Sequence, residues 1–387
     1  MSLLKSLPVS RTPTPAPDAH LWDALIIGAG PAGSVAAAIL SARGWRTLLV
    51  ERSPWPRDKA CGGCLNHAAL CMLQSLGLAD ALPDSTPLHR LFVRLKKKSL
   101  TVPIPTGAAI ARRDLDAHLV SIAIHRGTTF KPQTAARLLP SHDADPYRTV
   151  QLSSHGESLT ARAKIILAAD GLHGTSLAHE PWAKKTTAPR IRLGFSATIP
   201  APDLCPDGTI AMLVAPDGYV GLVRLPAGRL HIGASLNPQA CNTRHGPAPV
   251  IARILDHCQT PVPAALFSAT FTGTGPLTVH RQRVAGHRVL ALGDAGGYVE
   301  PFTGEGISWA IRSAIEAANL LPENSADCRH TLAHQWQHRH ATAIRHRQRY
   351  CRSLRQILHR PALAALCMSL ATRLPGIPAI LAAKIST

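Results

Sequence analysis

A glycine-rich turn between two apolar runs is the feature that most constrains the fold of this chain. The chain reads Ile-Ile-Gly28-Ala-Gly30-Pro-Ala-Gly33, and the next apolar run, 48–50, is followed by Glu51. This order predicts a strand, a tight turn, a helix and a second strand, with the phosphates of a dinucleotide at the helix N-terminus. Glu51 stands where a carboxylate can accept hydrogen bonds from the hydroxyls of a ribose.

The composition indicates a folded, two-lobed protein. A hydrophobic fraction of 45% excludes a disordered chain despite the 32 prolines, and 387 residues suffice for two lobes. Nine cysteines without a repeating spacing favour reduced thiols in a cytoplasmic protein over a disulfide framework. Residues 1–20 lack the apolar run of a signal peptide, so we expect a flexible leader. The most apolar long stretch, 361–383, is broken by an arginine and prolines.

The net charge of +19 is unevenly distributed. Asp327 is the last acidic residue, and ten lysines and arginines follow it. Apolar residues at helical spacing accompany them: Leu354, Ile357, Leu358, Leu363, Leu366, Leu370 and Leu374. Two interpretations stay open, a helix docked on the body with a solvated basic face or reversible peripheral contact with an anionic membrane, at its inner face. We expect no nucleic acid partner, because no recognition-helix signature or aromatic-interleaved basic stretch is present.

Pattern changes along the chain predict an α/β architecture whose nucleotide-binding lobe is interrupted by an antiparallel sheet. We expect a hairpin around Lys96, helices at 68–76 and from Asp114, and buried strands ending before Asp170 and Gly293. Five further strands are expected at 190–199, 209–214, 219–225, 230–236 and 265–279. The expected segments are a leader (1–20), the first part of the nucleotide-binding lobe (21–185), the antiparallel sheet of a substrate lobe (186–282), the second part of the nucleotide-binding lobe (283–325) and a basic amphipathic helical C-terminus (326–387).

Three apolar runs end in polar signatures: the turn Gly28–Gly33, the pair Asp170-Gly171 and the pair Gly293-Asp294. Ligands of open α/β sheets lie at the carboxyl ends of strands, so all three should meet at one site. In this order they resemble the FAD-dependent family of p-hydroxybenzoate hydroxylase, geranylgeranyl reductase and the flavin-dependent halogenases. The resemblance covers roughly residues 22–320. It implies a Rossmann-like FAD-binding lobe with an inserted antiparallel substrate sheet and a resident FAD.

The resemblance also assigns FAD contacts residue by residue. Glycines at 304 and 306 open a helix whose free N–H groups can stabilise negative charge on the reduced flavin ring. Gly174 departs from the family pattern, where a small hydroxyl residue is usual. The implied cofactor-binding residues are Gly28, Gly30, Ala32, Gly33, Glu51, Arg52, Cys61, Gly62, Arg112, Asp170, Gly171, Gly293, Asp294, Gly304, Glu305, Gly306 and Ile307.

Two segments resemble the geranylgeranyl-reductase branch most closely, the Cys61-Gly62-Gly63 turn and the Pro-Phe-Thr-Gly-Glu-Gly stretch from Pro301. They make Cys61 and Pro301 candidates for the catalytic centre, and Tyr219 is a third candidate on the inserted sheet. Cys61 and Cys64 could form a redox pair, or the glycines could let the backbone pass close to the flavin. We expect no metal site: His334 and His338 are four residues apart but lack further ligands, which favours a solvated basic helix.

Three reactions fit this frame. Because only one dinucleotide signature is present, we expect transient NAD(P)H, or else another redox protein, to reduce the FAD. We favour monooxygenation of a hydrophobic or phenolic small molecule through a flavin hydroperoxide. The alternative is reduction of isoprenoid double bonds, although the chain reads Tyr219-Val-Gly-Leu-Val-Arg-Leu-Pro226 where that branch usually has Tyr-x-Trp-x-Phe-Pro. Halogenation lacks its Trp-x-Trp-x-Ile-Pro segment. A quinone-linked electron-transfer flavoprotein is a further alternative.

Overall fold

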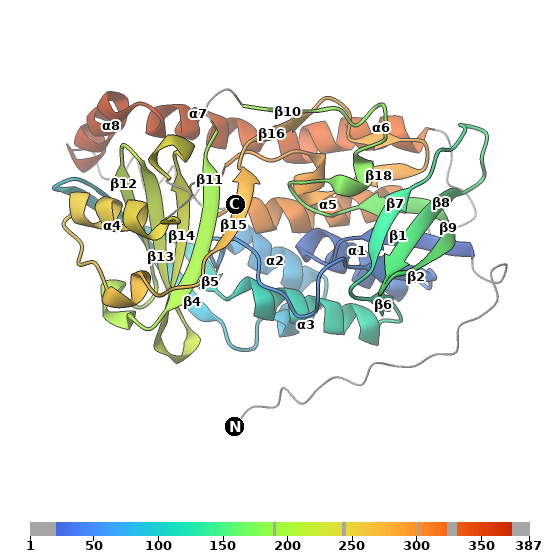
Figure 1. Cartoon of the computed structure of the whole chain (residues 1–387), viewed down its shortest axis with the longest axis horizontal. Coiled ribbons are helices and arrows are strands. Elements are labelled where there is room, and N and C mark those ends of the chain that lie inside the picture. The colour runs from blue at the N-terminus through green and yellow to red at the C-terminus, as the bar shows by residue number, and fades with distance from the viewer. Residues whose placement is uncertain are drawn as a thin grey trace.

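The computed structural model describes residues 21–188, 191–241, 245–300, 302, 304–322 and 331–373, and it contains two large sheets with helices between and around them (Figure 1). The expected leader 1–20, the candidate Pro301 and the last stripe residue, Leu374, lie outside these residues.

The first sheet is the expected Rossmann-like sheet. Its strand order is β17-β18-β9-β1-β2-β6, and β8 and β7 extend it along the first half of β9. The neighbours β18, β9, β1, β2 and β6 run parallel, whereas β7, β8 and β17 pair antiparallel. The bounds are β1 (Leu21–Ile27), β2 (Thr47–Val50), β6 (Thr129–Lys131), β7 (Ala135–Leu138), β8 (Arg148–Ser154), β9 (Glu157–Ala168), β17 (Ala285–Gly286) and β18 (Val289–Ala291).

Three helices pack against one another beside this sheet: α1 (Pro31–Ala42), α3 (Arg112–His125) and α5 (Gly306–Leu320). Helix α1 lies between the other two and is buried along almost its whole length, because small alanines let its neighbours approach closely. Strand β1 and the last residues of β9, 165–168, are buried on both faces, which explains their continuous apolar runs. This core fixes the strand ends at which the site forms.

The second sheet has the order β15-β11-β14-β13-β12-β4-β5-β3 and stands at the other end of the molecule (Figure 1). Helix α2 packs on β5 of this sheet, and helix α4 packs on β12 and β13. The bounds are β3 (Cys64–Leu65), α2 (His67–Ser75), β4 (Thr86–Leu95), β5 (Lys98–Ala109), β11 (Leu193–Ile199), β12 (Thr209–Ala215), β13 (Gly218–Leu225), β14 (Arg229–Leu236), α4 (Ala248–His257) and β15 (Thr272–Pro276).

This sheet is larger than the sequence predicts, which changes the expected domain boundaries. The hairpin of β4 and β5 forms around Lys96 as expected, but it pairs with β12 instead of staying in the nucleotide-binding lobe. The β4–β12 pair is parallel, so the sheet is not purely antiparallel. Leu91, Val93 and Leu95 pack with Met212 and Val214 of β12. Burial of this apolar face gives the hairpin a physical reason to leave the segment 21–185.

The strand expected at 265–279 is the main secondary-structure error. The chain instead forms a short 3₁₀ turn at Ala264–Leu266, then β15, and then β16 (Val279–Arg281), which pairs with β10 (Lys185–Thr187) in a separate two-stranded sheet. Pro276 ends β15, because proline lacks the N–H that a continuing ladder needs.

Helices α6 (Leu332–His340), α7 (Gln348–Leu358) and α8 (Pro361–Arg373) follow, with a π-helical turn at Ala341–Arg345 between the first two. Helix α8 packs on β5. The predicted apolar stripe is half-buried at Leu354, Ile357, Leu358 and Leu363, but Leu366 and Leu370 are exposed. Within the described ranges, no helix is both long and apolar enough to cross a bilayer.

Candidate functional site

The glycine turn after β1 brings backbone close to backbone, as its sequence predicts. Gly28 has a φ of +101°, and a Cβ there would lie 2.5 Å from the carbonyl oxygen of Ala169 at the end of β9. A Cβ at Gly33 would overlap the carbonyl oxygen of Gly28. Gly30 is the N-cap of α1 and makes no side-chain capping bond, so the helix N-terminus faces the pocket that Gly30 and Ala32 line. These features suit a bound phosphate.

Glu51 stands directly after β2, but its carboxylate already has partners. It accepts hydrogen bonds from the backbone N–H groups of Ala29 (3.2 Å) and Ser53 (3.1 Å) and from Nε of Arg57 (3.1 Å). Burial alone would raise the pKa of Glu51, but Arg57 and the two backbone N–H groups hold it below its ordinary value. Glu51 is therefore an ionised acceptor beside the turn, and its predicted contact with a ribose stays a prediction. Arg52 is exposed and outside the pocket lining.

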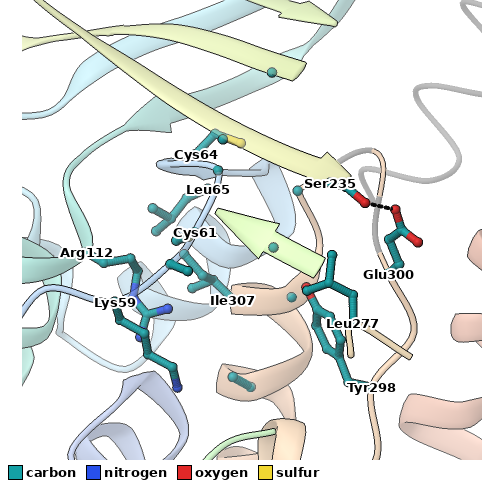
Figure 2. A pocket seen from close by; sticks show the side chains of 18 of the residues that line it. Lys59, Cys61, Cys64, Leu65, Arg112, Ser235, Leu277, Tyr298, Glu300 and Ile307 are labelled. Atoms are coloured by element: carbon teal, nitrogen blue, oxygen red, sulfur yellow. Dashed lines mark hydrogen bonds between the residues drawn. The ribbon is translucent and has the colours of Figure 1, made fainter. Parts of the chain in front are cut away.

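A basic group marks one end of the pocket. Arg112, at the start of α3, forms a two-bond ion pair with Asp116 (2.9 and 3.1 Å), and Arg57 contacts the same carboxylate at 3.1 Å. Lys59 lies with Arg112 at this end of the pocket (Figure 2). Burial and the neighbouring Arg112 lower the pKa of Lys59. These cations lie beside the free N-terminus of α1, where a pyrophosphate would be neutralised.

Two predicted aspartates follow buried strands, yet they take different roles. Asp294 lines the pocket; burial raises its pKa, while Lys59 and Arg112 oppose that shift. Asp170 accepts hydrogen bonds from the backbone N–H of Ser176 (2.8 Å) and the hydroxyl of Thr175 (3.2 Å), so it caps a short turn. Its Oδ1 is buried without a hydrogen-bond partner among the described residues. Gly171, and not Asp170, lines the pocket.

The Cys61–Gly63 loop lies across the second sheet. His231 of β14 contacts the carbonyl oxygen of Cys61 through Nε2 (2.9 Å), and its Nδ1 lies 3.0 Å from the hydroxyl of Thr198. A Cβ at Gly233 would lie 2.9 Å from Cα of Gly62, so backbone packs directly on backbone here. The loop therefore links the two lobes at the middle of the pocket.

No disulfide joins Cys61 and Cys64 in this structure. Burial raises the pKa of Cys64 to about 12, and Cys61 nearby adds to the shift, so Cys64 stays a thiol at neutral pH. Cys64 packs beneath Gly304, where a Cβ would lie 2.8 Å from its Sγ. These contacts favour the interpretation in which the glycines bring the backbone close to a ligand.

Helix α5 opens at the same place. Gly304 (φ +78°), Gly306 and Ile307 line the pocket, and the helix has no side-chain cap at Glu305. The side chain of Glu305 accepts a hydrogen bond from Cys351 of α7 (3.1 Å) and is outside the lining, which leaves only its backbone for the predicted contact. A second helix N-terminus thus faces the pocket, as the flavin ring requires.

The far end of the pocket is apolar and covered by the second sheet. Tyr219 lines it and packs edge-on against Phe302, with ring centroids 5.1 Å apart. Tyr298 and Leu277 lie beside it, and Ser235 donates a hydrogen bond to Glu300 (Figure 2). The other apolar lining residues include Leu91, Ile104, Phe195, Ile210, Met212 and Val223. One continuous pocket therefore joins a phosphate-binding end to an apolar end.

These residues fit FAD. Two helix N-termini lack side-chain caps and face one pocket, cationic side chains lie beside the first, and glycines stand where a Cβ would fill the space. The structure brings together Gly30, Ala32, Cys61, Gly62, Arg112, Gly171, Tyr219, Gly293, Asp294, Gly304, Gly306 and Ile307. The sequence did not single out Arg57, His231 or Glu300 as site residues.

The histidines that the sequence places on one solvated helix differ in their exposure to solvent. His334 and His338 are exposed, but the neighbouring His340 is 1% exposed and packs on Trp336. In the part of the chain that the structure describes, no group of three histidine, cysteine, aspartate or glutamate side chains could hold a metal ion.

Comparisons with known proteins agree with this geometry. A family model described as "FAD binding domain" matches residues 22–348. The menaquinone reductase of Mycobacterium tuberculosis (strain H37Rv) is 28% identical over 328 residues, 77% of this chain and 76% of that protein. The digeranylgeranylglycerophospholipid reductase of Methanocella arvoryzae is 26% identical over 316 residues, 78% of this chain and 77% of that protein.

Solved structures with the same fold are more distant in sequence. The flavin-dependent brominase Bmp2 superposes with a TM-score of 0.76 at 18% identity, over 95% of this chain and 93% of the other. The p-nitrophenol 4-monooxygenase PnpA from Pseudomonas putida superposes with a TM-score of 0.72 at 16% identity, over 90% and 93%. At these identities the likeness establishes the fold alone.

Proposed function

Because this chain belongs to the FAD-binding-domain family, we propose that it is an FAD-dependent monooxygenase that hydroxylates an apolar, phenol-like small molecule with NAD(P)H as the transient reductant. The FAD-dependent oxidoreductase class follows from the family. The choice of reaction and substrate is our proposal.

The observation that carries it is the wall of the pocket at Gly221 of β13. Counted from Tyr219, this glycine stands at the tryptophan position of the Tyr-x-Trp-x-Phe-Pro pattern of the reductase branch, and it pairs across the sheet with Gly233. Both glycines line the pocket, together with the apolar side chains Ile210 and Val223. Gly62 packs on Gly233, and Sδ of Met212 lies 3.1 Å from where a Cβ of Gly221 would stand, so this part of the wall is compact and apolar. We take such a wall to suit a flat ring better than a single extended chain.

When bound, reduced FAD would supply the activated oxygen, and the chain's own residues do the rest. Gly30, Arg112 and the N-terminus of α1 would hold the pyrophosphate. The N-terminus of α5 at Gly306 would face the flavin ring. The second sheet would cover the substrate and exclude water, which protects a reactive oxygen species from decay. Overall, the substrate, one O₂, one NAD(P)H and one proton yield the hydroxylated product, water and NAD(P)⁺.

Reduction of a double bond is the second candidate, and the sequence relatives favour it, since the two reported above are named as reductases. That reaction needs a proton donor near the flavin. Cys61 and Tyr298 line the pocket, and burial, reinforced by Asp294, raises the pKa of Tyr298 well above its ordinary value, so its hydroxyl stays protonated.

Peripheral membrane contact is a further proposal about the partners of this chain. Leu366 and Leu370 lie one helical turn apart and are 56% and 50% exposed, with exposed Arg360 and Arg373 at the two ends of α8. Such a face suits an anionic lipid surface.

Turnover with labelled oxygen tests the reaction. Purified holoenzyme is incubated with NADPH or NADH, ¹⁸O₂ and a panel of alkylphenols and isoprenoid quinones. We expect O₂ uptake stimulated by a phenol and one ¹⁸O atom in the product. Anaerobic turnover that adds two hydrogens would instead establish the reductase, and protein without flavin absorbance would contradict both.

A further inference from the structure

The apolar end of the pocket contains a buried carboxylate, Glu300. Its side chain is 3% exposed, and it lines the pocket together with Ser235 and Tyr219. Figure 2 shows Glu300 and Ser235 on the side of the pocket opposite to Lys59 and Arg112. The basic end is explained by the phosphates of FAD, but nothing in the proposed reaction so far uses a carboxylate at the other end.

Five side chains surround this carboxylate, and the hydroxyl of Tyr219 is one of them. Ser235 donates a hydrogen bond to Oε1, and Nη1 of Arg192 lies 3.7 Å from the same oxygen. Nε of Arg355 and Nε2 of His359 lie 3.8 and 3.7 Å from Oε2. These last distances exceed those of hydrogen bonds, and Oε2 accepts none from the residues that the structure describes. The carboxylate thus has ion-pair partners near both oxygens, and it has lone pairs that can accept a further hydrogen bond.

The surrounding charges keep Glu300 ionised. Burial alone would raise its pKa, but His359, Arg192 and the hydroxyls of Ser235 and Tyr219 hold it below its ordinary value. Burial and the charge of Glu300 raise the pKa of Tyr219 well above its ordinary value, so Tyr219 stays a neutral phenol. Arg192 is fixed in turn by stacking on the Tyr219 ring (5.5 Å) and by the carbonyl of Leu358. The group is a pre-formed acceptor at neutral pH.

A buried carboxylate is costly unless donors satisfy it, and a purely hydrocarbon substrate would offer none. We propose that Glu300 determines specificity by accepting a hydrogen bond from a neutral hydroxyl group of an otherwise apolar substrate. This inference rests on the proposed function in that the substrate is a phenol-like molecule, with its reacting carbon toward Cys61 and its hydroxyl toward Glu300. An ionised phenolate has no proton to donate, so it cannot form this hydrogen bond to the carboxylate.

The protonation state of a bound phenol tests this proposal without any turnover. The probe is 4-nitrophenol, whose ionised form is yellow and whose neutral form is nearly colourless. Oxidised holoenzyme is titrated with it at a pH at which the free probe is half ionised, and difference spectra are recorded. We expect the yellow absorbance to fall on binding, because Glu300 favours the neutral hydroxyl. A rise in yellow absorbance, or no binding of the probe, would overturn the proposal.

The variant Glu300→Gln removes the charge and keeps the shape. It leaves Arg192 and Arg355 unopposed, so we expect it to bind the yellow form and to bind the neutral form about tenfold more weakly. An unchanged spectrum in Glu300→Gln would contradict the role of the carboxylate. Retained flavin absorbance and circular dichroism establish that the variant folds.

If Glu300→Gln does not fold, the proposal is tested by comparing two probes on the wild-type protein. 4-Nitroanisole has the same ring but no hydroxyl, and we expect it to bind about tenfold more weakly than neutral 4-nitrophenol. Equal affinities would overturn the proposal. Both measurements are of equilibrium binding, so they are independent of turnover. If the yellow absorbance of the probe falls on binding but turnover forms no oxygenated product, the role of Glu300 stands and the proposed monooxygenation is excluded.

Discussion

His231 shows how one side chain can set the position of a loop that the reaction needs. Its Nε2–H donates to the carbonyl of Cys61 and its Nδ1 accepts from the hydroxyl of Thr198. Burial lowers the pKa of His231, so the ring stays neutral and both bonds persist at neutral pH. The imidazole thus ties the loop to the second sheet, together with the hydrogen bond from the Cys61 N–H to Ser196 (3.4 Å) and the packing of Gly62 on Gly233.

The substitution His231→Ala should loosen this loop without unfolding the protein. The loss of one hydrogen bond of roughly 1–1.5 kcal/mol predicts about tenfold faster amide exchange in residues 58–65, measured by hydrogen-exchange mass spectrometry. Thr198→Val, which leaves the bond to Cys61 in place, should have a smaller effect. Unchanged exchange in His231→Ala would mean that the sheet holds the loop by packing alone.

Among single residues, the sequence predicts a place in the pocket for those that directly follow an apolar run. Gly30, Gly171 and Asp294 lie in the pocket because each follows a buried apolar strand, and strands of a parallel sheet end at one edge. His231 and Glu300 carry no such signal. Their roles depend on which residues of another strand or helix lie opposite them, and that register is a tertiary property.

Among the elements, α6 docks through two buried rings. Trp336 is fully buried and donates to the carbonyl of Ala291 (3.2 Å), and the ring of His340 packs against it with centroids 5.6 Å apart. Neither nitrogen of His340 has a hydrogen-bond partner among the described residues. Burial, aided by the charge of Arg345, lowers the pKa of His340 to about 3. The sequence pattern, which suggested a solvated histidine-rich helix, could not distinguish this position from His338.

A depressed histidine pKa makes stability depend on pH in a defined direction. Below the ordinary histidine pKa of about 6.5 the unfolded chain binds a proton at His340 that the folded protein does not bind. The free energy of unfolding should therefore fall as pH decreases from about 6.5 toward 3, by up to about 1.4 kcal/mol per pH unit from this residue.

Urea denaturation at pH 7, 6 and 5 checks this. His340→Phe should reduce the loss of stability between pH 7 and 5, because phenylalanine has no proton to bind in either state. The exposed His334→Gln serves as the matched control and should keep the wild-type dependence. Equal slopes in wild type and His340→Phe would show that His340 is protonated in the folded protein.

The elements also show why the lobe boundaries were misplaced. The hairpin Thr86–Ala109 is local and its turn at Lys96 could be predicted, whereas its parallel pairing with β12 joins residues more than a hundred positions apart. Strand pairing across such separations follows from the fit of apolar faces, here Leu91 and Val93 against Met212. No local pattern in a single sequence encodes it.

For the molecule as a whole, the pocket lies between two lobes, and the chain contributes three separate segments to the first sheet and two to the second. The first sheet supplies the basic end of the pocket and the second sheet supplies its apolar wall, so each lobe alone forms only part of the pocket lining. The C-terminal helices complete it, since Arg355 and His359 reach Glu300 and Cys351 reaches Glu305. The basic C-terminus thus has an inward role in addition to its exposed face.

That exposed face carries the last prediction. The two exposed leucines of α8 and the cations that follow Asp327 should bind vesicles containing phosphatidylglycerol, and binding should weaken as salt screens the charges. The double variant Leu366→Ser, Leu370→Ser should reduce partitioning about thirtyfold, because each half-exposed leucine contributes roughly 1 kcal/mol on burial. Ile124→Ser, an exposed apolar residue on α3, is the control and should partition as the wild type does. Vesicle sedimentation measures all three. Equal binding to uncharged phosphatidylcholine vesicles, or an unaffected double variant, would exclude this face, and an apolar substrate would then have to reach the pocket from solution.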